Sequence, residues 1–460
     1  MRALVWFRRD LRVEDNQALS AAVACGLPVE AVYIYPPDPD APLAEGAAAR
    51  WYLYYSLLAL QQRLAELGIP LGFFTGEEAS VLRECVLDGS ITQAYWNRIV
   101  DPQQEVRDAR ARSALEESGV ACHLFEDDCL MMPEVACKAD GTAYKVFTPF
   151  WRNLRDRLRE YDLLRRLLPA PQPVGPPSPS SSREVDVIGL LTPHSWYKKL
   201  HACWEPGERG AQERLTRFIE QGLNDYAARR DLPGVDGSSR LSAALHFGEL
   251  SVARVYTSVE FLRVHEPEES ARESMRCFLA EIGWREFARH VLHSFPHSLS
   301  QSINPLFDST GVWEPDPGNE RARAWKSGET GIALVDAGMR QLWETGWMHN
   351  RVRMVAASFL TKNLGIHWRE GARWFAETLV DADRANNTLG WQWVAGCGTD
   401  AAPYYRIFNP ATQAKKFDAD GSYVDRWLAD RAAFPPIADL KLSRARALER
   451  YRTAIRHPPV

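Results

Sequence analysis

The spacing of apolar residues changes once along this chain of 460 residues, and that change limits the fold more than any other feature. Up to about residue 130, short apolar runs typical of buried strands alternate with longer stretches at helical spacing. From about residue 206 the helical spacing continues, and no strand-like segment interrupts it. The sequence therefore predicts an α/β domain followed by a large all-α domain.

The first domain should contain a doubly wound parallel sheet. Its expected strands are the apolar runs at 3–7, 30–35, 71–74, 92–96 and 122–125. Between two of them, residues 47–67 have the periodicity of an amphipathic helix. Strands that alternate with helices favour parallel pairing through crossover connections. No G-x-G-x-x-G motif follows the first strand, so a dinucleotide is not indicated in this domain.

The second domain should be built from helices alone. Its clearest helical segments are 212–222, 253–264, 272–294, 334–345, 351–364 and 371–380. Before them, a Pro- and Ser-rich stretch at 169–182 is typical of a surface linker. We therefore expect an α/β domain at 1–130, a connection at 131–205 that contains this linker, and a helical domain at 206–460.

The composition bears on partners and location. The formal net charge is −5, so DNA binding would need a local basic patch. The eight cysteines show no zinc-ligand spacing, which indicates reduced thiols and no metal site. The first apolar run is too short for a signal peptide, and no segment is long and apolar enough to span a membrane. We expect a cytoplasmic monomer that does not enter a membrane.

Residues 381–410 combine polar and large aromatic side chains. The carboxylates Asp381 and Asp383 and the amide Asn387 precede two indoles, Trp391 and Trp393. Buried polar groups cost free energy unless something bonds to them. A large planar ligand with polar edges would satisfy both the polar and the aromatic groups. A packing segment capped by Asp and Asn explains the composition alone equally well.

Three further segments suit an anionic or heterocyclic ligand. Residues 236–242 place serine hydroxyls at an expected helix start, which suits an anion but also an ordinary helix cap. Glu281 and Trp284 share one helix face, where they could hold a flat ring or form only a surface carboxylate beside a core indole. Asn350 and Met354 also share a helix face. The arginines beside them could bind phosphate or could simply form a solvent-exposed basic face of the helix.

These segments resemble the motifs of the photolyase and cryptochrome family. The likeness is greatest to bacterial class I cyclobutane pyrimidine dimer photolyases, and it extends, with interruptions, over nearly the whole chain. It includes Trp-Phe-Arg-Arg-Asp-Leu-Arg at 6–12, Lys-Val-Phe-Thr-Pro-Phe-Trp at 145–151 and residues 381–410. In this family the α/β domain holds an antenna pigment and the helical domain holds FAD.

The resemblance implies one non-covalent FAD and no metal. The residues that match the family's FAD contacts are Tyr226, Ser238, Ser239, Arg240, Leu241, Ser242, Phe278, Arg353, Asp381, Ala382, Asp383 and Asn387. Among them, the loop at 238–242 would hold the diphosphate. Arg353 would pair with Asp381, and Asn387 would face the flavin N5.

The resemblance also implies a pocket for damaged DNA. The matching lesion and DNA contacts are Glu281, Trp284, Arg285, Asn350, Arg351, Met354 and Trp393. Glu281 would contact the lesion bases between two walls, Trp284 and Trp393, and Arg351 would meet a DNA phosphate. The implied catalytic residues are Glu281, Asn387, Met354, Trp391, Trp368 and Trp313, of which the three tryptophans would form an electron relay in that order.

Two departures bear on the pigment and the substrate. Folate-using members contact the pterin with an Asn-Glu pair, and this chain has Gln103-Gln104 there. The lysine that assists in those members falls near Ser300 in this chain. A folate antenna is therefore disfavoured, and a deazaflavin, another pigment or none stays open. Photolyases of the (6-4) type carry histidines where this chain has Asn350 and Met354, and His349 should point away from the flavin. These positions favour cyclobutane dimers.

The resemblance therefore predicts a light-driven DNA repair enzyme, a deoxyribodipyrimidine photo-lyase. It would flip a pyrimidine dimer from UV-damaged DNA into a pocket beside FAD and split it by electron transfer. A cryptochrome-type blue-light receptor with the same fold and FAD but no repair is the alternative. A plain electron-transfer flavoprotein without a DNA partner is a third. The lesion-side residues Glu281, Trp284, Asn350, Met354 and Trp393 argue against both.

Overall fold

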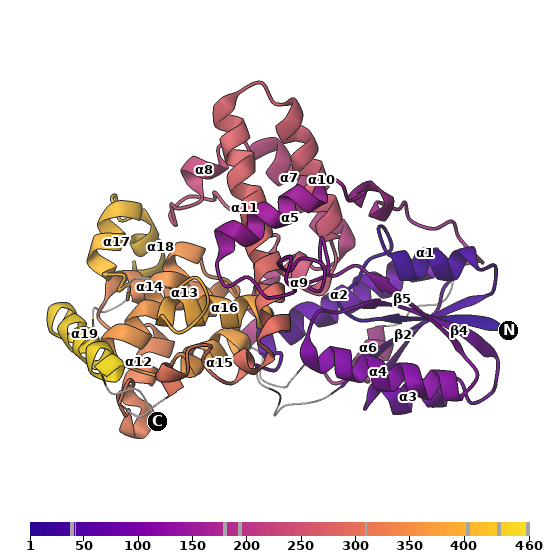
Figure 1. Cartoon of the computed structure of the whole chain (residues 1–460), viewed down its shortest axis with the longest axis horizontal. Helices are drawn as coiled ribbons and strands as arrows, with labels where there is room; N and C mark the ends of the chain where they lie inside the picture. The colour runs from indigo at the N-terminus through magenta and orange to yellow at the C-terminus, as the bar shows by residue number, and fades with distance from the viewer. Residues whose placement is uncertain are drawn as a thin grey trace.

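The computed structural model consists of an α/β part and a helical part that pack side by side (Figure 1). The structure describes residues 1–36, 41, 43–177, 182–191, 196–308, 311–401, 405–429 and 434–456. The fold class expected from the sequence, a parallel α/β domain and an all-α domain, is confirmed.

The sheet of the α/β part is parallel throughout, in the order β3-β2-β1-β4-β5. Its strands are β1 (Arg2–Phe7), β2 (Val29–Tyr35), β3 (Leu71–Thr75), β4 (Ile91–Arg98) and β5 (Ala121–Glu126). Each expected strand coincides with one of these, with ends that differ by at most two residues. Because the chain starts in the middle of the sheet and winds outward both ways, the fold is doubly wound.

Helices cover both faces of the sheet. They are α1 (Gln17–Ala24), α2 (Ala47–Glu66), α3 (Glu78–Cys85) and α4 (Pro102–Glu117). Alternate residues of β1 point to opposite faces. Val5 and Phe7 pack with α1 and α2, whereas Leu4 and Trp6 pack with α3 and α4. This two-sided burial explains why the strand is apolar without interruption.

The helical part begins within the connection and continues to the end of the described chain. Its helices are α5 (Phe147–Leu158), α7 (Glu208–Gln221), α8 (Tyr226–Arg229), α9 (Ser242–Phe247), α10 (Val252–His265), α11 (Glu269–Ser294), α12 (Glu320–Ser327), α13 (Ala333–Thr345), α14 (Asn350–Ser358), α15 (Trp368–Thr378), α16 (Arg384–Ala395), α17 (Pro410–Phe417), α18 (Ser422–Leu428) and α19 (Leu440–Arg456). The short helix α6 (Ser182–Asp186), also from the connection, packs instead on α2 and β3 of the α/β part. Short 3₁₀ turns lie at Leu163–Arg166, Trp196–Ala202, Pro296–Leu299, Pro305–Asp308 and Pro317–Asn319. The expected helices are all present.

One expected helix, 351–364, is not continuous. The α-helix α14 ends at Ser358, and a π-helical turn, Phe359–Asn363, follows it. Within this turn Lys362 is buried, and its amine donates a hydrogen bond to Ala395 O at 2.6 Å. Apolar spacing does not predict such a turn, because its position depends on a contact with another helix.

The connection at 131–205 packs against both parts. Trp151 of α5 contacts Tyr256 of α10, edge to face, with a centroid separation of 6.4 Å. Further along, the Val174 amide donates to Leu67 O at the end of α2, so part of the Pro-rich stretch is tied to the α/β part. Residues 178–181 of that stretch lie outside the described residues. The domain limits expected from the sequence stay a prediction.

Close packing joins the two parts. Tyr52 of α2 stacks on Phe247 of α9 with a centroid separation of 5.3 Å, and its hydroxyl donates to Glu249 at 2.8 Å. A Cβ at Gly46 would lie 2.1 Å from the Glu377 backbone, so only glycine permits this approach of α2 to α15. The contact holds the first domain against the helices that build the site described below.

Two kinds of site are not found in the described part of the chain. None of its helices has the length and apolar character needed to cross a membrane. It likewise contains no group of three His, Cys, Asp or Glu side chains arranged to hold a metal ion. All eight cysteines are free thiols, as their spacing indicated.

Candidate functional site

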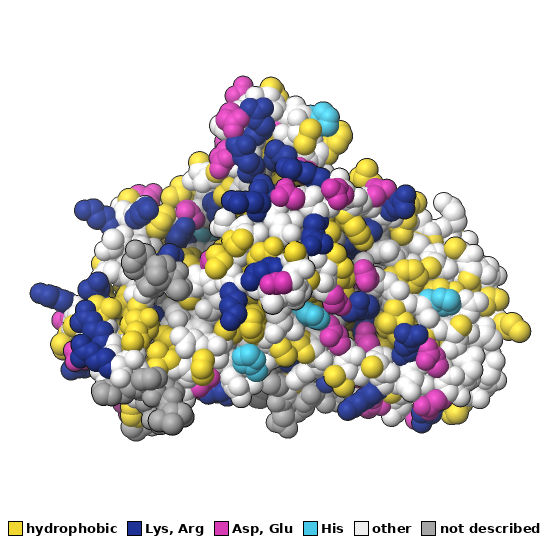
Figure 2. Space-filling view, in the orientation of Figure 1, with side chains coloured by type: hydrophobic (Ala, Val, Ile, Leu, Met, Phe, Trp, Pro, Cys, Tyr) yellow, Lys and Arg dark blue, Asp and Glu magenta, His cyan; other side chains and the backbone are white. Residues whose placement is uncertain are grey.

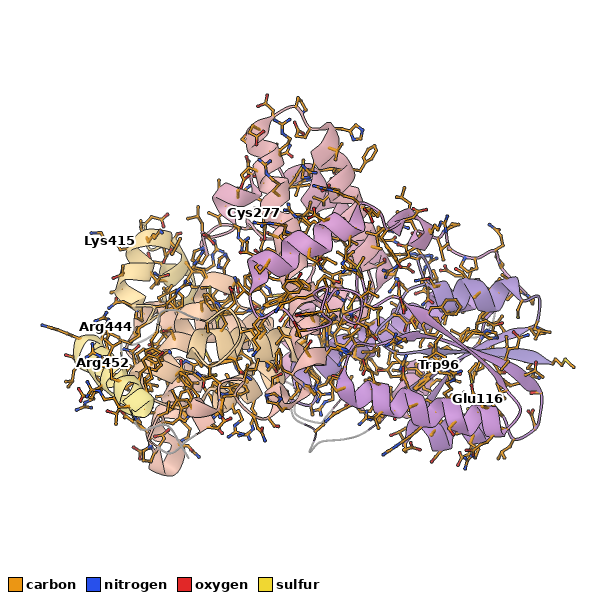
Figure 3. All side chains as sticks on the ribbon, viewed as in Figure 1. Trp96, Glu116, Cys277, Lys415, Arg444 and Arg452 are labelled. Atoms are coloured by element: carbon orange, nitrogen blue, oxygen red, sulfur yellow. The ribbon has the colours of Figure 1, made fainter. Side chains whose placement is uncertain are left out.

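A cavity of about 570 Å³ opens among α8, α9, α11, α14, α15 and α16. Figure 3 shows the side chains that these helices carry and labels Cys277 on α11. Eighteen of the predicted site residues line it: Tyr226, Ser239, Leu241, Ser242, Phe278, Glu281, Trp284, Arg285, Asn350, Arg351, Arg353, Met354, Asp381, Ala382, Asp383, Asn387, Trp391 and Trp393. The FAD set and the lesion set of the sequence analysis therefore share one cavity. The remaining four, Ser238, Arg240, Trp313 and Trp368, are not among its lining residues.

Asp381 is bonded from two helices. Its Oδ2 accepts from Arg353 Nη2 of α14 at 2.9 Å, which is the pair that the motifs predicted. The same oxygen accepts from Ser242 Oγ of α9 at 2.6 Å. Asp381 Oδ1 is buried and has no hydrogen-bond partner among the described residues. Asp381 is thus held rigidly while one of its oxygens remains able to bond a ligand.

Asp383 begins α16 as its N-cap. Its Oδ1 accepts from the Asn386 amide at 2.8 Å, and its Oδ2 accepts from Arg289 Nη2 at 3.2 Å. Burial alone would raise the pKa of Asp383, but the Arg289 guanidinium outweighs burial and holds this pKa well below 3.8. Arg289 also bonds Asp128, so the carboxylate is anchored to the chain just after β5.

Two predicted residues are held by hydrogen bonds along the cavity wall. The side-chain amide of Asn387 donates to Ala372 O of α15 at 2.9 Å, which fixes the orientation of this amide. Arg285 is buried, and its Nη1 donates to Asp128 O and to Glu286, each at 2.8 Å. Arg285 therefore belongs to a buried ion cluster, and its expected contact with DNA stays a prediction.

Glu281 is paired with an arginine that the sequence analysis missed. Arg230 donates to Glu281 Oε1 at 2.6 Å, and its guanidinium lies over the Tyr226 ring at 5.3 Å. Glu281 and Arg230 are partly exposed and line the cavity. Arg230 follows Tyr226 by four residues, and this helical spacing could have indicated that it lies on the same side as Tyr226. Arg230 can orient the carboxylate and contribute positive charge.

Two flat indoles are presented to the cavity. Trp284 stacks on Phe147 with a centroid separation of 3.8 Å and an interplanar angle of 8°. The Trp393 indole N–H donates to Asp400 O at 3.2 Å. Both side chains are partly exposed. Each ring is supported on one side by the protein, and aromatic faces of this kind suit stacking with bases.

The loop before α9 is only partly directed at the cavity. Arg240 has a positive φ of 52°, pairs with Asp236 at 3.2 Å and lies over the Trp347 ring. Ser239 and Ser242 line the cavity instead. The anion contacts of this loop stay a prediction, and the geometry favours these two serines for them.

The three relay tryptophans occupy different surroundings. Trp391 lines the cavity, is 2% exposed, and touches Trp325 with a centroid separation of 6.0 Å. Trp368 is fully buried, and its indole N–H donates to Ser302 Oγ at 3.1 Å. The ring of His367 lies 4.7 Å from Trp313 and 5.8 Å from Trp368. Sequence reasoning identified neither His367 nor Trp325, and the order of the relay stays a prediction.

Basic side chains gather locally despite the net charge of −5. Figure 2 shows Lys and Arg over α19 at the left edge of the molecule. Figure 3 labels Arg444 and Arg452 on this helix and Lys415 on α17. At the cavity, Arg351 pairs with Asp231 at 2.6 Å and lies over the Phe417 ring of α17 at 4.5 Å. The basic side chains thus gather on α17 and α19, and Arg351 stands at the cavity itself.

The residues at the folate-contact positions have other partners. Gln103 Oε1 accepts from Arg384 Nη2 of α16 at 2.9 Å, and Arg384 Nη1 bonds Asp101 at 3.1 Å. Gln103 thus joins the α/β part to the first residue of a cavity helix. The Ser300 hydroxyl donates to His297 O at 3.4 Å. The identity of an antenna pigment stays open.

The cavity suits a large ligand with polar edges. Several buried polar atoms around it have no hydrogen-bond partner among the described residues, namely Asp381 Oδ1, both ring nitrogens of His246, Arg289 Nη1 and Trp391 Nε1. Unpaired buried polar atoms cost free energy unless a ligand or water bonds to them. Their mixture of donors and acceptors beside aromatic walls fits FAD, the cofactor implied by the motifs.

Comparisons with known proteins agree with this fit. Residues 3–174 match the family model described as DNA photolyase, and residues 278–453 match the FAD binding domain of DNA photolyase. A deoxyribodipyrimidine photo-lyase of Agrobacterium fabrum is 40% identical over 435 residues, which are 93% of this chain and 87% of that protein. Cryptochrome-1 of Arabidopsis thaliana is 36% identical over 438 residues, 94% of this chain and 63% of that protein.

A solved structure is also similar over the whole chain. It is a bacterial class III photolyase from Agrobacterium tumefaciens, with a TM-score of 0.88 and 36% identity. The match covers 99% of this chain and 98% of the other. The chain belongs to the photolyase and cryptochrome family. Its helical part contains the FAD-binding domain of that family. The expected assignment to class I is not confirmed by these comparisons.

Proposed function

We propose that this protein is a deoxyribodipyrimidine photo-lyase that splits cyclobutane pyrimidine dimers in UV-damaged DNA under light. One observation carries the proposal: ten of the twelve predicted FAD contacts and all seven predicted lesion contacts line the same cavity. A protein that only bound FAD would have no need of the lesion-side set. The similarity to photo-lyases of 40% identity supports the same activity.

In this proposal FAD is held between α9 and α16. Ser239 and Ser242 bind its anionic part, Asp381 offers its unpaired Oδ1, and Asn387 faces the flavin ring. Arg353 keeps Asp381 in place. When bound, FAD supplies the light-excited electron that the reaction requires, and the protein supplies position and electrostatics.

The lesion side is formed by stacking surfaces and one carboxyl group. Trp284 and Trp393 hold the flipped bases, and a distorted dimer costs less to flip than an intact pair. Glu281, oriented by Arg230, bonds the base edge, and the Arg230 guanidinium beside it offsets the negative charge that the dimer gains. Arg351 binds a DNA phosphate after it leaves its partner Asp231.

The proposed substrate is the cyclobutane dimer rather than the (6-4) product. Asn350 and Met354 line the cavity where (6-4) photolyases carry histidines, and an amide has no pKa useful for proton transfer. The neighbouring His349 is buried and is not among the cavity-lining residues. Burial lowers the pKa of His349 to about 4, so it is uncharged at neutral pH.

The alternative is a cryptochrome-type receptor, which is supported by the 36% identity to a plant cryptochrome. The two functions differ at the lesion side of the cavity, because a receptor needs no stacking walls for bases. Within the photolyases we propose class I, as the motifs predicted, although a similar solved structure is a class III photolyase. We further propose that the protein acts as a cytoplasmic monomer.

A repair assay tests the proposal. FAD-loaded protein is incubated with an oligonucleotide that carries one thymine dimer, in blue light and in darkness, and a (6-4) oligonucleotide serves as the comparison. We expect the cyclobutane dimer to be repaired only in light and the (6-4) product to remain unchanged. Protein that binds FAD but repairs neither substrate would support the receptor instead.

A further inference from the structure

His246 occupies a position on the cavity wall that the motifs did not assign. It follows Ser242 by four residues in α9, and Asn387 follows Asp383 by four residues in α16. Residues four apart lie on one helix face, so each helix presents two polar groups in line. His246 is 3% exposed and lines the cavity, with its ring against Phe247 at 4.4 Å.

His246 and Arg289 meet at one carboxylate oxygen. His246 Nδ1 lies 3.5 Å from Asp383 Oδ2, and Arg289 Nη2 donates to the same oxygen at 3.2 Å. The other oxygen, Oδ1, accepts from the backbone and the side-chain amide of Asn386 at 2.8 and 2.9 Å. Asp383 is therefore fixed by three hydrogen bonds, and the imidazole and the guanidinium both approach its Oδ2.

Each of these two side chains keeps an unsatisfied atom. Within the described part of the chain, both ring nitrogens of His246 and Arg289 Nη1 have no hydrogen-bond partner, although both side chains are at least 97% buried and line the cavity. Nδ1 is the ring nitrogen on the side of the Asp383 carboxylate, at 3.5 Å, and the tautomer with its hydrogen on Nδ1 leaves Nε2 as an acceptor. Arg289 Nη1 is a donor. One acceptor and one donor on the same cavity wall match a hydroxyl group, which donates one hydrogen bond and accepts others.

We infer that His246 binds a ribityl hydroxyl of FAD, with Arg289 donating to the same group. The inference rests on the proposed binding of FAD. Ser242 marks the proposed diphosphate end of the cavity and Asn387 marks the proposed flavin ring. His246 and Asp383 lie on the same helix faces as those residues, so the polyol chain that joins the two ends of FAD passes them. His246 is thus a cofactor-binding residue.

The first test measures FAD affinity from the quenching of FAD fluorescence when it binds the apoprotein. Phe fills the space of the imidazole but has no ring nitrogen, so His246→Phe should weaken FAD binding roughly five- to tenfold, the loss of one neutral hydrogen bond. His246→Gln keeps an acceptor and should recover part of the affinity. His290→Phe is the control, because His290 is equally buried and lies outside the cavity-lining set.

The second test changes the ligand. FAD analogues that each lack one ribityl hydroxyl are titrated into both proteins. One analogue should bind the wild type several-fold more weakly than FAD, and His246→Phe should bind that analogue and FAD equally well. Equal FAD affinity of His246→Phe and the wild type, or an equal loss in His290→Phe, would overturn the inference. A wild type that takes up no FAD would instead overturn the proposed function.

Discussion

The substitution Gly371→Ala tests how tightly Trp391 is held. A Cβ at Gly371 of α15 would lie 1.9 Å from Trp391 Cη2 and 2.4 Å from Cζ3, where ordinary contacts are 3.4–4 Å. Trp391 is 2% exposed and is backed by Phe375, at a centroid separation of 5.0 Å, and by Trp325. The indole can yield only toward the cavity that it lines. Adding one methyl group should therefore disturb both the packing and the cofactor pocket.

The expected size follows from two opposing terms. Overpacking of a filled core costs about 1–3 kcal/mol, whereas replacing a helical glycine by alanine gains about 0.5–1 kcal/mol. The net loss should be about 1–2 kcal/mol, which for a chain of this length corresponds to a fall in the unfolding midpoint of about 1–2 °C. Gly390→Ala in α16 is the matched control for stability, because its Cβ would meet nothing within 4 Å. That variant should unfold slightly later than the wild type.

The assay follows helix content by circular dichroism during heating of the apoproteins, and FAD affinity by titration. Gly371→Ala should unfold earlier and bind FAD more weakly. If Gly371→Ala gained stability as Gly390→Ala does, helix propensity alone would govern the position. The contact between α15 and Trp391 would then be looser than described.

Three further outcomes are expected. Trp391→Phe should abolish light-driven reduction of oxidised FAD, followed by absorbance, but spare repair by pre-reduced enzyme, and equal loss of both would indicate a packing role. Arg351→Ala should weaken the binding of damaged and undamaged DNA to a similar degree, and it should lower the slope of log affinity against log salt concentration by about one. Loss of lesion binding alone would show that Arg351 contacts bases. Burial lowers the pKa of His290, His349 and His367 to about 4 from 6.5, so the unfolded chain binds protons that the folded chain does not. Stability should therefore fall as the pH drops from about 6.5 to about 4, and a flat unfolding midpoint over that range would contradict this.

Local patterns predicted the fold well because burial is periodic. The uninterrupted apolar run of β1 follows from helices on both faces of the sheet, and the strands and helices were found near their expected ends. The pair of Arg353 and Asp381 was expected only because the family motifs associate them. Neither the π-helical turn after Ser358 nor the buried amine of Lys362 has a local signature, since both depend on a contact with Ala395.

The missed residues are those whose roles depend on distant partners. Arg230 meets Glu281 across 51 residues of sequence, and Arg289 meets Asp383 across 94. His246 gives no pattern of its own, and only the folded structure shows that it lines the cavity and approaches Asp383. Sequence spacing places side chains along one element, whereas these contacts join different elements.

The central claim is that one cavity brings FAD and a flipped dimer into contact. The most direct measurement is the fluorescence lifetime of bound, reduced FAD while DNA is added. A thymine-dimer oligonucleotide should shorten the lifetime, because the dimer takes the excited electron, and the undamaged oligonucleotide of the same sequence should leave it unchanged. Glu281→Ala should lower the repair yield more than it lowers FAD binding. An identical lifetime with damaged and undamaged DNA, at concentrations where both are bound, would contradict the claim.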